Sequence, residues 1–272
     1  MKLCISTLAC PGWDLQQIID VCAANQIAGV DFRGLQNEID VTKLPAFTGD
    51  GLDETLSRLR SRGIEIPCMN SGVALEAPAE RWNDMLEETR RTCDICRRSG
   101  TRYLRVFGGA VPNEMTREEG RILAQRRLRQ LAKMTRPAKV LILIETHDHW
   151  ITFEQVNELL ADTDPEEVGV LWDTEHTWRK GEPPETTVAR HGERLRHVHV
   201  KDSTPPPAGE KKSVPKLLGE GELPIGQFVK ALTDAGYEGW YCLETEKRWH
   251  QAAPEPEVSI PQFAQYMRGL ST

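Results

Sequence analysis

Leu141-Ile142-Leu143-Ile144-Glu145 is a run of four aliphatic residues that ends in a carboxylate. A short apolar run of this kind is typical of a β-strand that is buried on both faces. Strands buried on both faces belong to parallel sheets that helices cover from outside. The run therefore predicts a parallel α/β sheet.

Short apolar runs alternate with longer amphipathic runs along the whole chain. The runs typical of strands are Lys2–Ser6, Gly29–Phe32, Ile64–Met69, Tyr103–Phe107, Val140–Glu145, Val168–Asp173, Arg196–Val200 and Trp240–Glu244. The runs typical of helices are Asp14–Asn25, Leu52–Arg62, Ala79–Ser99, Arg117–Thr135, Thr152–Leu160, Thr186–Gly192, Pro224–Ala235 and Ile260–Leu270. Eight strands alternating with eight helices predict one α/β domain over residues 1–272, a single (β/α)8 TIM barrel.

Local signals agree with these boundaries. Glycines follow three of the predicted helices, at Gly63, Gly100 and Gly236, and Thr116 with Glu119 forms a capping-box pattern. An open doubly wound sheet is the alternative, but it normally has a glycine-rich turn after its first strand, and that turn is not glycine-rich here. The Pro-rich segment 203–215 is interpreted as a surface loop and not as a domain boundary.

Composition excludes several classes of protein. The net charge of −7, with 39% hydrophobic and 28% charged residues, is typical of a soluble globular protein and unfavourable for binding nucleic acid. The sequence contains no apolar run long enough to cross a membrane. Residues 1–6 are interpreted as a strand and not as a signal peptide, which predicts a cytoplasmic protein.

The cysteines are compatible with a cytoplasmic protein, because the seven of them show no pattern of paired disulfides. Cys4, Cys68 and Cys242 lie within predicted strands and are interpreted as small buried hydrophobic residues. Cys93 and Cys96 form an isolated C-x-x-C in a predicted helix, and without a second pair it does not indicate a metal or redox site.

Acidic and imidazole side chains gather where four consecutive strands end. Glu145, Asp173, His199 and Glu244 occupy these positions, and in a barrel the carboxyl ends of the strands form one face. One such residue alone could cap a helix or pair with an arginine. Three carboxylates together would repel one another unless a cation lay between them. The set predicts one divalent metal ion, with Mn2+, Mg2+, Co2+ or Zn2+ favoured over copper or an iron–sulfur cluster.

Strand periodicity places His197 and His199 on the same face of their strand. His199 is nearer the carboxyl end and is the predicted ligand. His197 is predicted to be a hydrogen-bonded core histidine. Lys201 and Asp202 follow directly and are predicted to support the ligands from just outside them.

The sequence resembles the xylose isomerase-like barrel superfamily of sugar phosphate isomerases and epimerases. The motifs that carry the resemblance are Glu145, Asp173-Thr174-Glu175-His176, His197-Val198-His199-Val200-Lys201-Asp202, Gly219-Glu220-Gly221-Glu222-Leu223-Pro224, and Gly236-Tyr237-Glu238-Gly239 leading to Glu244. The resemblance implies that Glu145, Asp173, His199 and Glu244 bind the metal and that His176 contacts substrate. It also implies that Glu145 and Glu244 exchange protons with a sugar carbon.

The resemblance predicts an isomerase or epimerase of a sugar or sugar phosphate, which works by proton transfer through a metal-stabilised enediolate. A metal-dependent dehydratase of a cyclic keto-polyol or a dehydroshikimate-like substrate is the alternative, and no residue separates the two. A non-catalytic sugar-binding barrel would not need both Glu145 and Glu244. The related three-metal endonucleases use further histidines after the third and fourth strands, which this sequence lacks.

Other residues near the predicted mouth are candidates for contact with a small-molecule substrate. They are His147, Lys201, Arg248, Trp249 and Trp13, with Arg33 and Arg105 as weaker candidates for the same rim. Tryptophan rings can stack on sugar C–H faces, and a cationic pair such as Lys247-Arg248 can hold a phosphate or carboxylate. We expect no nucleic-acid or membrane partner. The sequence does not decide whether the chain forms a homo-oligomer.

Overall fold

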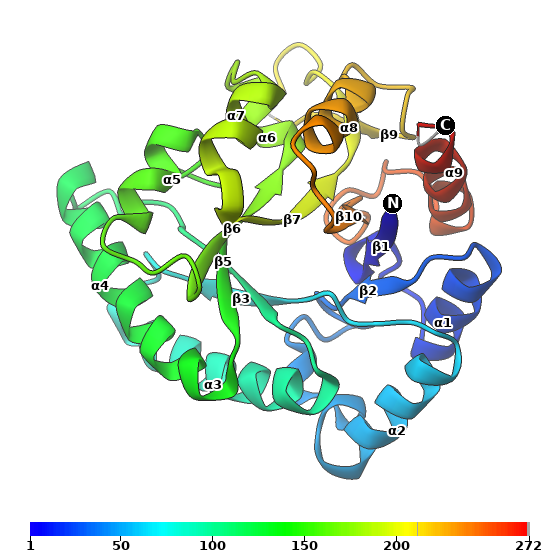
Figure 1. Cartoon of the computed structure of the whole chain (residues 1–272), viewed down its shortest axis with the longest axis horizontal. Coiled ribbons are helices and arrows are strands. Elements are labelled where there is room, and N and C mark those ends of the chain that lie inside the picture. The colour runs from blue at the N-terminus through cyan, green and yellow to red at the C-terminus, as the bar shows by residue number, and fades with distance from the viewer. Residues whose placement is uncertain (211, 271–272) are drawn as a thin grey trace.

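The computed structural model describes residues 1–210 and 212–270, which form an α/β barrel with helices around a ring of strands (Figure 1). The barrel strands are β1 (Lys2–Ser6), β2 (Gly29–Asp31), β3 (Cys68–Ala74), β4 (Tyr103–Phe107), β5 (Leu141–Glu145), β6 (Val168–Asp173), β7 (Leu195–Val200) and β10 (Trp240–Leu243). They are hydrogen-bonded in parallel in the order β2-β1-β10-β7-β6-β5-β4-β3. Isolated parallel bridges from Gly29 to Glu65 and from Phe32 to Met69 link the remaining edges, so the barrel is nearly closed. The predicted fold class is confirmed.

Helices cover the outside of the ring (Figure 1). They are α1 (Leu15–Ala24), α2 (Gly49–Ser61), α3 (Trp82–Ser99), α4 (Arg117–Thr135), α5 (Phe153–Leu160), α6 (Thr174–Arg179), α7 (Pro184–His191), α8 (Ile225–Asp234) and α9 (Pro256–Gly269). Short 3-10 turns occupy Thr7–Ala9, Val41–Lys43, Pro45–Phe47, Ala79–Arg81, Arg136–Ala138 and Gly192–Arg194. Within the described residues, no helix is both long and apolar enough to cross a membrane.

Most predicted helix and strand bounds agree with the structure to within a few residues. The predicted capping box at Thr116 and Glu119 starts α4, and Gly100 ends α3 with a φ of 85°. The short helix α6 was not predicted, because six residues are too few to establish a helical period. The third strand begins at Cys68 and not at Ile64, and α9 begins at Pro256, four residues before the predicted start at Ile260.

Side chains along β5 alternate between two apolar clusters. Ile142 and Ile144 belong to the large cluster that joins strands to helices, whereas Leu141 and Leu143 pack in a small cluster with Cys68 and Leu171. Successive residues of a strand face opposite sides of the sheet, so the small cluster lies inside the barrel. Glu145, two residues after Leu143, therefore points inward at the end where β5 stops.

The segment after β7 folds onto the barrel through Asp202. Its carboxylate accepts backbone N–H hydrogen bonds from Ser203 (2.8 Å), Gly219 (2.8 Å), Gly221 (3.0 Å) and Leu223 (3.1 Å). An antiparallel hairpin of β8 (Asp202–Thr204) and β9 (Val214–Lys216) begins at the same residue and was not predicted. The carboxylate of Asp202, which was predicted to support the metal ligands, is directed to these loop amides.

Asp202→Ala is expected to lower the free energy of unfolding by about 2–4 kcal/mol, because a buried amide left unpaired costs roughly 1–3 kcal/mol. Chemical denaturation monitored by tryptophan fluorescence measures the change. Glu220→Ala, an exposed substitution in the same loop, is the matched control and should change the stability by less than about 0.5 kcal/mol. Equal stability of the two variants would show that Asp202 does not hold the loop.

Candidate metal centre

Four side chains converge at the carboxyl ends of neighbouring strands. Glu145 ends β5, Asp173 ends β6, His199 lies near the end of β7 and Glu244 directly follows β10. Each is at most 3% exposed, and one potential ligand atom from each lies within 4.8 Å of the others. The four residues selected from the sequence are therefore brought together.

The donor set fits a divalent cation. His199 directs its Nδ1 into the set, at 3.2 Å from Glu145 Oε1 and 3.4 Å from Glu244 Oε1. Among the described residues, Glu145 Oε2 and Asp173 Oδ2 have no well-aligned hydrogen bond although both atoms are buried. Three carboxylates and one imidazole nitrogen are ligands that Zn2+, Mn2+, Co2+ or Mg2+ accept. Without a cation, three buried carboxylates at this spacing would be strongly destabilising.

Two basic side chains offset part of this negative charge. Lys201 Nζ lies 2.8 Å from both Asp173 Oδ2 and Glu244 Oε2, and Arg105 Nε lies 3.2 Å from Glu145 Oε2. Burial opposes the charge on Lys201, but Asp173 and Glu244 raise its pKa well above the usual range. The structure thus keeps an ammonium group beside the carboxylates.

The two glutamates of the set lie in different surroundings. Burial opposes ionisation of Glu145, but Arg105 and His199 hold its pKa well below the usual range. Burial raises the pKa of Glu244, and Lys201 and His199 offset this only in part. Glu244 also lines the cavity described below, and Glu145 is not among the lining residues. Glu244 is therefore the more accessible of the two carboxylates.

His197 lies behind the set as the predicted core histidine. Its Nε2 is 2.7 Å from Asp31 Oδ2, and both side chains are fully buried. Burial lowers the pKa of His197, but Asp31 raises it more strongly, to about 10. Asp31 was not selected from the sequence, and the signal that could have identified it is a lone carboxylate within the apolar strand Gly29–Phe32. Asp31 Oδ2 also lies 3.9 Å from His199 Nε2, so the pair contacts the back of the four-residue set.

A cavity of about 540 Å³ opens above the set. His147, His176, Lys201 and Trp249, predicted substrate contacts, line it together with the weaker candidates Arg33 and Arg105. Lining residues that were not selected from the sequence include Phe107, Arg179, Lys212 and Ser213. Lys212 and Ser213 come from the loop that Asp202 anchors, and the sequence gives no direct signal that this loop covers the cavity.

Two histidines on the cavity wall lie against each other. The ring centroids of His147 and His176 are 4.6 Å apart. Burial opposes protonation of His147, but Asp148 and Glu145 raise its pKa to about 9. Burial lowers the pKa of His176, whose Nε2 is 3.7 Å from Asp173 Oδ2. The wall therefore places an imidazole with a raised pKa against one with a lowered pKa, next to the carboxylates.

Two predicted substrate contacts lie elsewhere. Trp13 is buried in the apolar core, where its indole N–H donates to Glu257 Oε1 at 3.2 Å. Arg248 donates to the backbone carbonyl of Gln36 and is not among the cavity-lining residues. Its neighbour Lys247 bonds to Gln251, Ala253 and Glu255. These positions correct the predicted roles of Trp13 and Arg248, and the Lys247-Arg248 pair does not form an anion site at the cavity.

Comparison with known proteins agrees with this architecture. The family model described as xylose isomerase-like TIM barrel matches residues 19–269, which confirms the resemblance seen in the sequence. A curated relative, inosose dehydratase of Geobacillus thermodenitrificans, is 33% identical over 108 residues, which is 35% of this chain and 36% of the relative. The aligned part thus spans little more than a third of that relative's length.

Two solved structures share the whole fold. The crystal structure of the probable 3-DHS dehydratase AsbF of Bacillus anthracis has a TM-score of 0.82 at 15% identity, covering 98% of this chain and 99% of that one. The crystal structure of IOLI protein with a bound zinc atom has a TM-score of 0.79 at 20% identity, covering 100% of this chain and 96% of that one. At these identities, the likeness establishes the fold.

Asp173→Asn is expected to lower the metal content by one equivalent per chain relative to the unchanged protein, because it removes a charged ligand from the centre of the set. Elemental analysis of protein saturated with Mn2+ or Zn2+ and then freed of excess metal measures the loss. His149→Ala, an exposed substitution in the loop after β5, is the control and should keep the full content. An unchanged content in the Asp173 variant would place the ion elsewhere.

Proposed function

The chain belongs to the xylose isomerase-like TIM barrel family, and from this premise we propose that it is a metal-dependent enzyme that removes a proton next to the carbonyl group of a sugar-like substrate. The observation that carries the proposal is the convergence of Glu145, Asp173, His199 and Glu244 next to a cavity that Glu244 lines. Basic and imidazole groups on the cavity wall are suited to carbonyl, hydroxyl or phosphate oxygens.

In this proposal, the four converging residues hold one divalent ion, which is Mn2+, Mg2+, Co2+ or Zn2+. Once bound, the ion supplies Lewis-acid stabilisation of the negative charge that develops on substrate oxygen. Glu244 faces the cavity and takes the proton from carbon. Glu145 is the second carboxylate of the set and, in this proposal, the group that returns a proton. A proton beside a carbonyl is too weakly acidic to leave at neutral pH without both a base and stabilisation of the anion.

The remaining wall residues position the substrate. His147, His176 and Lys201 lie next to the carboxylates and, in this proposal, donate hydrogen bonds to substrate oxygens. Trp249 is 53% exposed at the rim, where its ring can cover an apolar sugar face. Arg33 and Arg105 also line the cavity and supply positive charge, which suits an anionic or electron-rich substrate.

Isomerisation or epimerisation is the first candidate reaction, because a two-carboxylate site can remove a proton and return one. Dehydration is the second candidate, and one observation favours it. The ammonium of Lys201 lies 2.8 Å from Glu244 Oε2, and both side chains line the cavity. In dehydration, Glu244 accepts the carbon-bound proton, the neighbouring C–O bond breaks as the C=C bond forms, and Lys201 protonates the departing hydroxide to give water. A curated relative that is an inosose dehydratase is consistent with this second candidate.

A panel of ketoses, aldoses, their phosphates, inososes and dehydroshikimate, incubated in D2O with metal-saturated protein, tests the proposal. Isomerisation or epimerisation yields a product of equal composition that carries solvent deuterium at the reacting carbon. Dehydration yields a product that has lost one water and absorbs as an enone. Transfer of the substrate hydrogen without solvent exchange, or no turnover of any member of the panel, would contradict the proposed proton removal.

Glu244→Gln is expected to lower kcat by about 10²–10⁴-fold, the usual contribution of a general base, when it is assayed at saturating metal. The rate of deuterium exchange into the substrate should fall with kcat. Glu246→Gln, which changes another carboxylate that lines the cavity, is the control and should retain most activity. Full activity of the Glu244 variant with bound metal would exclude Glu244 as the base.

Lys201→Met separates the two candidate reactions. If the enzyme is a dehydratase, water loss should fall by about 10²–10⁴-fold while deuterium exchange continues, because exchange needs the base but not the acid. If it is an isomerase or epimerase, exchange and product formation should change together. Lys212→Met, on the loop side of the cavity, is the matched control. Unchanged water loss in the Lys201 variant would contradict the acid role.

A further inference from the structure

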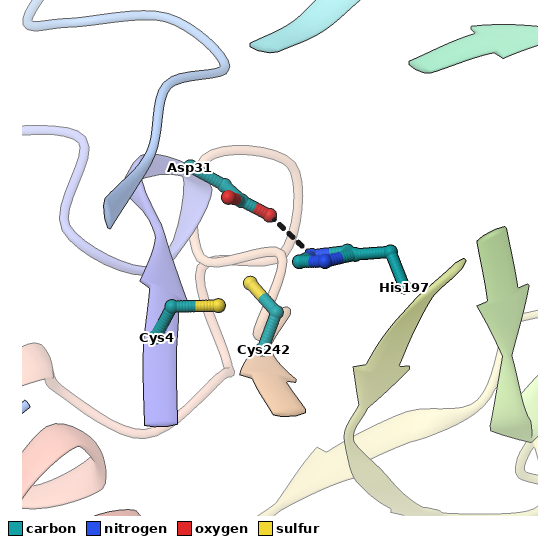
Figure 2. Close-up of side chains that lie close together, drawn as sticks. All are labelled: Cys4, Asp31, His197 and Cys242. Carbon is teal, nitrogen blue, oxygen red and sulfur yellow. Dashed lines mark hydrogen bonds and ion pairs between the residues drawn. The ribbon is translucent and has the colours of Figure 1, made fainter. Parts of the chain in front are cut away.

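A second group of potential metal ligands lies deeper in the barrel. Cys4 comes from β1, Asp31 from β2, His197 from β7 and Cys242 from β10, and their side chains point toward one another (Figure 2). All four residues are 0% exposed, and one ligand atom from each lies within 4.8 Å of the others. His197 and Cys242 precede His199 and Glu244 by two residues, so they face the same interior one layer further down.

The polarity of this layer requires an explanation. Barrel interiors are usually filled by branched aliphatic side chains, as on the opposite side here, where Leu141, Leu143 and Leu171 pack together. The Asp31–His197 contact of 2.7 Å accounts for one carboxylate oxygen and one ring nitrogen. Among the described residues, the other ring nitrogen of His197, Nδ1, has no hydrogen bond of good geometry although the ring is fully buried.

The two thiols contact each other and polar neighbours. Cys242 Sγ reaches the carbonyl of Leu243 at 3.8 Å, and Cys4 is hydrogen-bonded to Cys242 and to the imidazole of His197. The sequence-based interpretation of Cys4 and Cys242 as buried residues is confirmed. Their surroundings, however, are a carboxylate and an imidazole and not the apolar packing that was expected.

The carboxylate of Asp31 is oriented from outside the group. Its Oδ1 accepts the backbone N–H of Cys68 at 3.0 Å, which leaves Oδ2 directed at His197. Carboxylates that bind metals are commonly oriented in this way: one oxygen accepts a hydrogen bond from a neighbouring group, and the other oxygen is directed at the metal.

We propose that Cys4, Asp31, His197 and Cys242 form a second, buried metal site of the tetrahedral zinc type. Two thiolates, one imidazole nitrogen and one carboxylate oxygen are Zn2+ ligands, and thiolates disfavour Mg2+ and Mn2+. Uptake of the ion replaces the two thiol protons and one ring proton of His197, and all three pass to solvent. The site is distinct in donor chemistry from the Glu145, Asp173, His199 and Glu244 set, which contains no sulfur, and it does not depend on the proposed function.

Such an ion would have a structural role. It would join β1 and β2, from the start of the chain, to β7 and β10, from its end, across the β1–β10 seam of the barrel. Asp31 Oδ2 lies 3.9 Å from His199 Nε2. By holding Asp31 in place, the same ion would also fix the side chain that contacts His199, a member of the Glu145, Asp173, His199 and Glu244 set. Metal bound here stabilises the folded state by mass action, because the unfolded chain offers no preformed site.

Cobalt titration of the metal-stripped full-length protein tests the proposal, with Co2+ itself as the probe. Cobalt bound by thiolates gives an intense near-ultraviolet charge-transfer band, which cobalt bound only by oxygen and nitrogen lacks. We expect this band in the unchanged protein. The double variant Cys4→Ser/Cys242→Ser should lose the band and one equivalent of metal. Cys68→Ser, a change at another fully buried cysteine, is the control and should keep both.

The two sites are distinguished in the same experiment. Asp173→Asn should lose one equivalent of cobalt and keep the thiolate band, so failure of one site is separable from failure of the other. Absence of the band in the unchanged protein at two equivalents of cobalt would overturn the proposal. An intact mass two hydrogens lighter, from a Cys4–Cys242 disulfide, would overturn it as well. These two results need only the unchanged protein, so a double variant that fails to fold does not leave the question open.

Discussion

The mutual repulsion of three carboxylates buried at one end of a barrel is the constraint on which the site depends. Glu145, Asp173 and Glu244 come from strands β5 and β6 and from the end of β10, and the parallel order of the sheet brings these ends together. Lys201 and Arg105 compensate part of the charge. A divalent cation would supply the rest, and its ligands would then be held by attraction and not by packing alone.

The barrel interior is divided into two unlike halves. Strands β3, β5 and β6 contribute the apolar cluster of Cys68, Leu141, Leu143 and Leu171. Strands β1, β2, β7 and β10 contribute the polar group drawn in Figure 2. The apolar half gives a rigid support beneath Glu145, whereas the polar half lies beneath His199. The buried ionisable groups of the interior are therefore gathered on one side, and the apolar cluster occupies the other side.

Sequence periodicity predicted the barrel because its strands are buried on both faces and its helices are amphipathic. Glu145, Asp173, His199 and Glu244 were predictable because each lies where an apolar run ends. A lone carboxylate in an apolar strand marks Asp31 as unusual, but its partner His197 was not predictable, since the contact joins β2 and β7 across the barrel interior. Trp13 was misassigned because a loop tryptophan can pack into the core or face the mouth, and sequence alone does not separate the two. The hairpin after β7 was missed because a Pro-rich segment resembles an irregular loop.

A crystal structure of the metal-saturated protein, with anomalous diffraction recorded on both sides of the absorption edge of the metal, is the decisive test of the metal centre. We expect an anomalous peak between the carboxylates of Glu145, Asp173 and Glu244, within bonding distance of His199 Nδ1. No peak at that position in crystals that contain the metal, or an ion bound only at other residues, would contradict it.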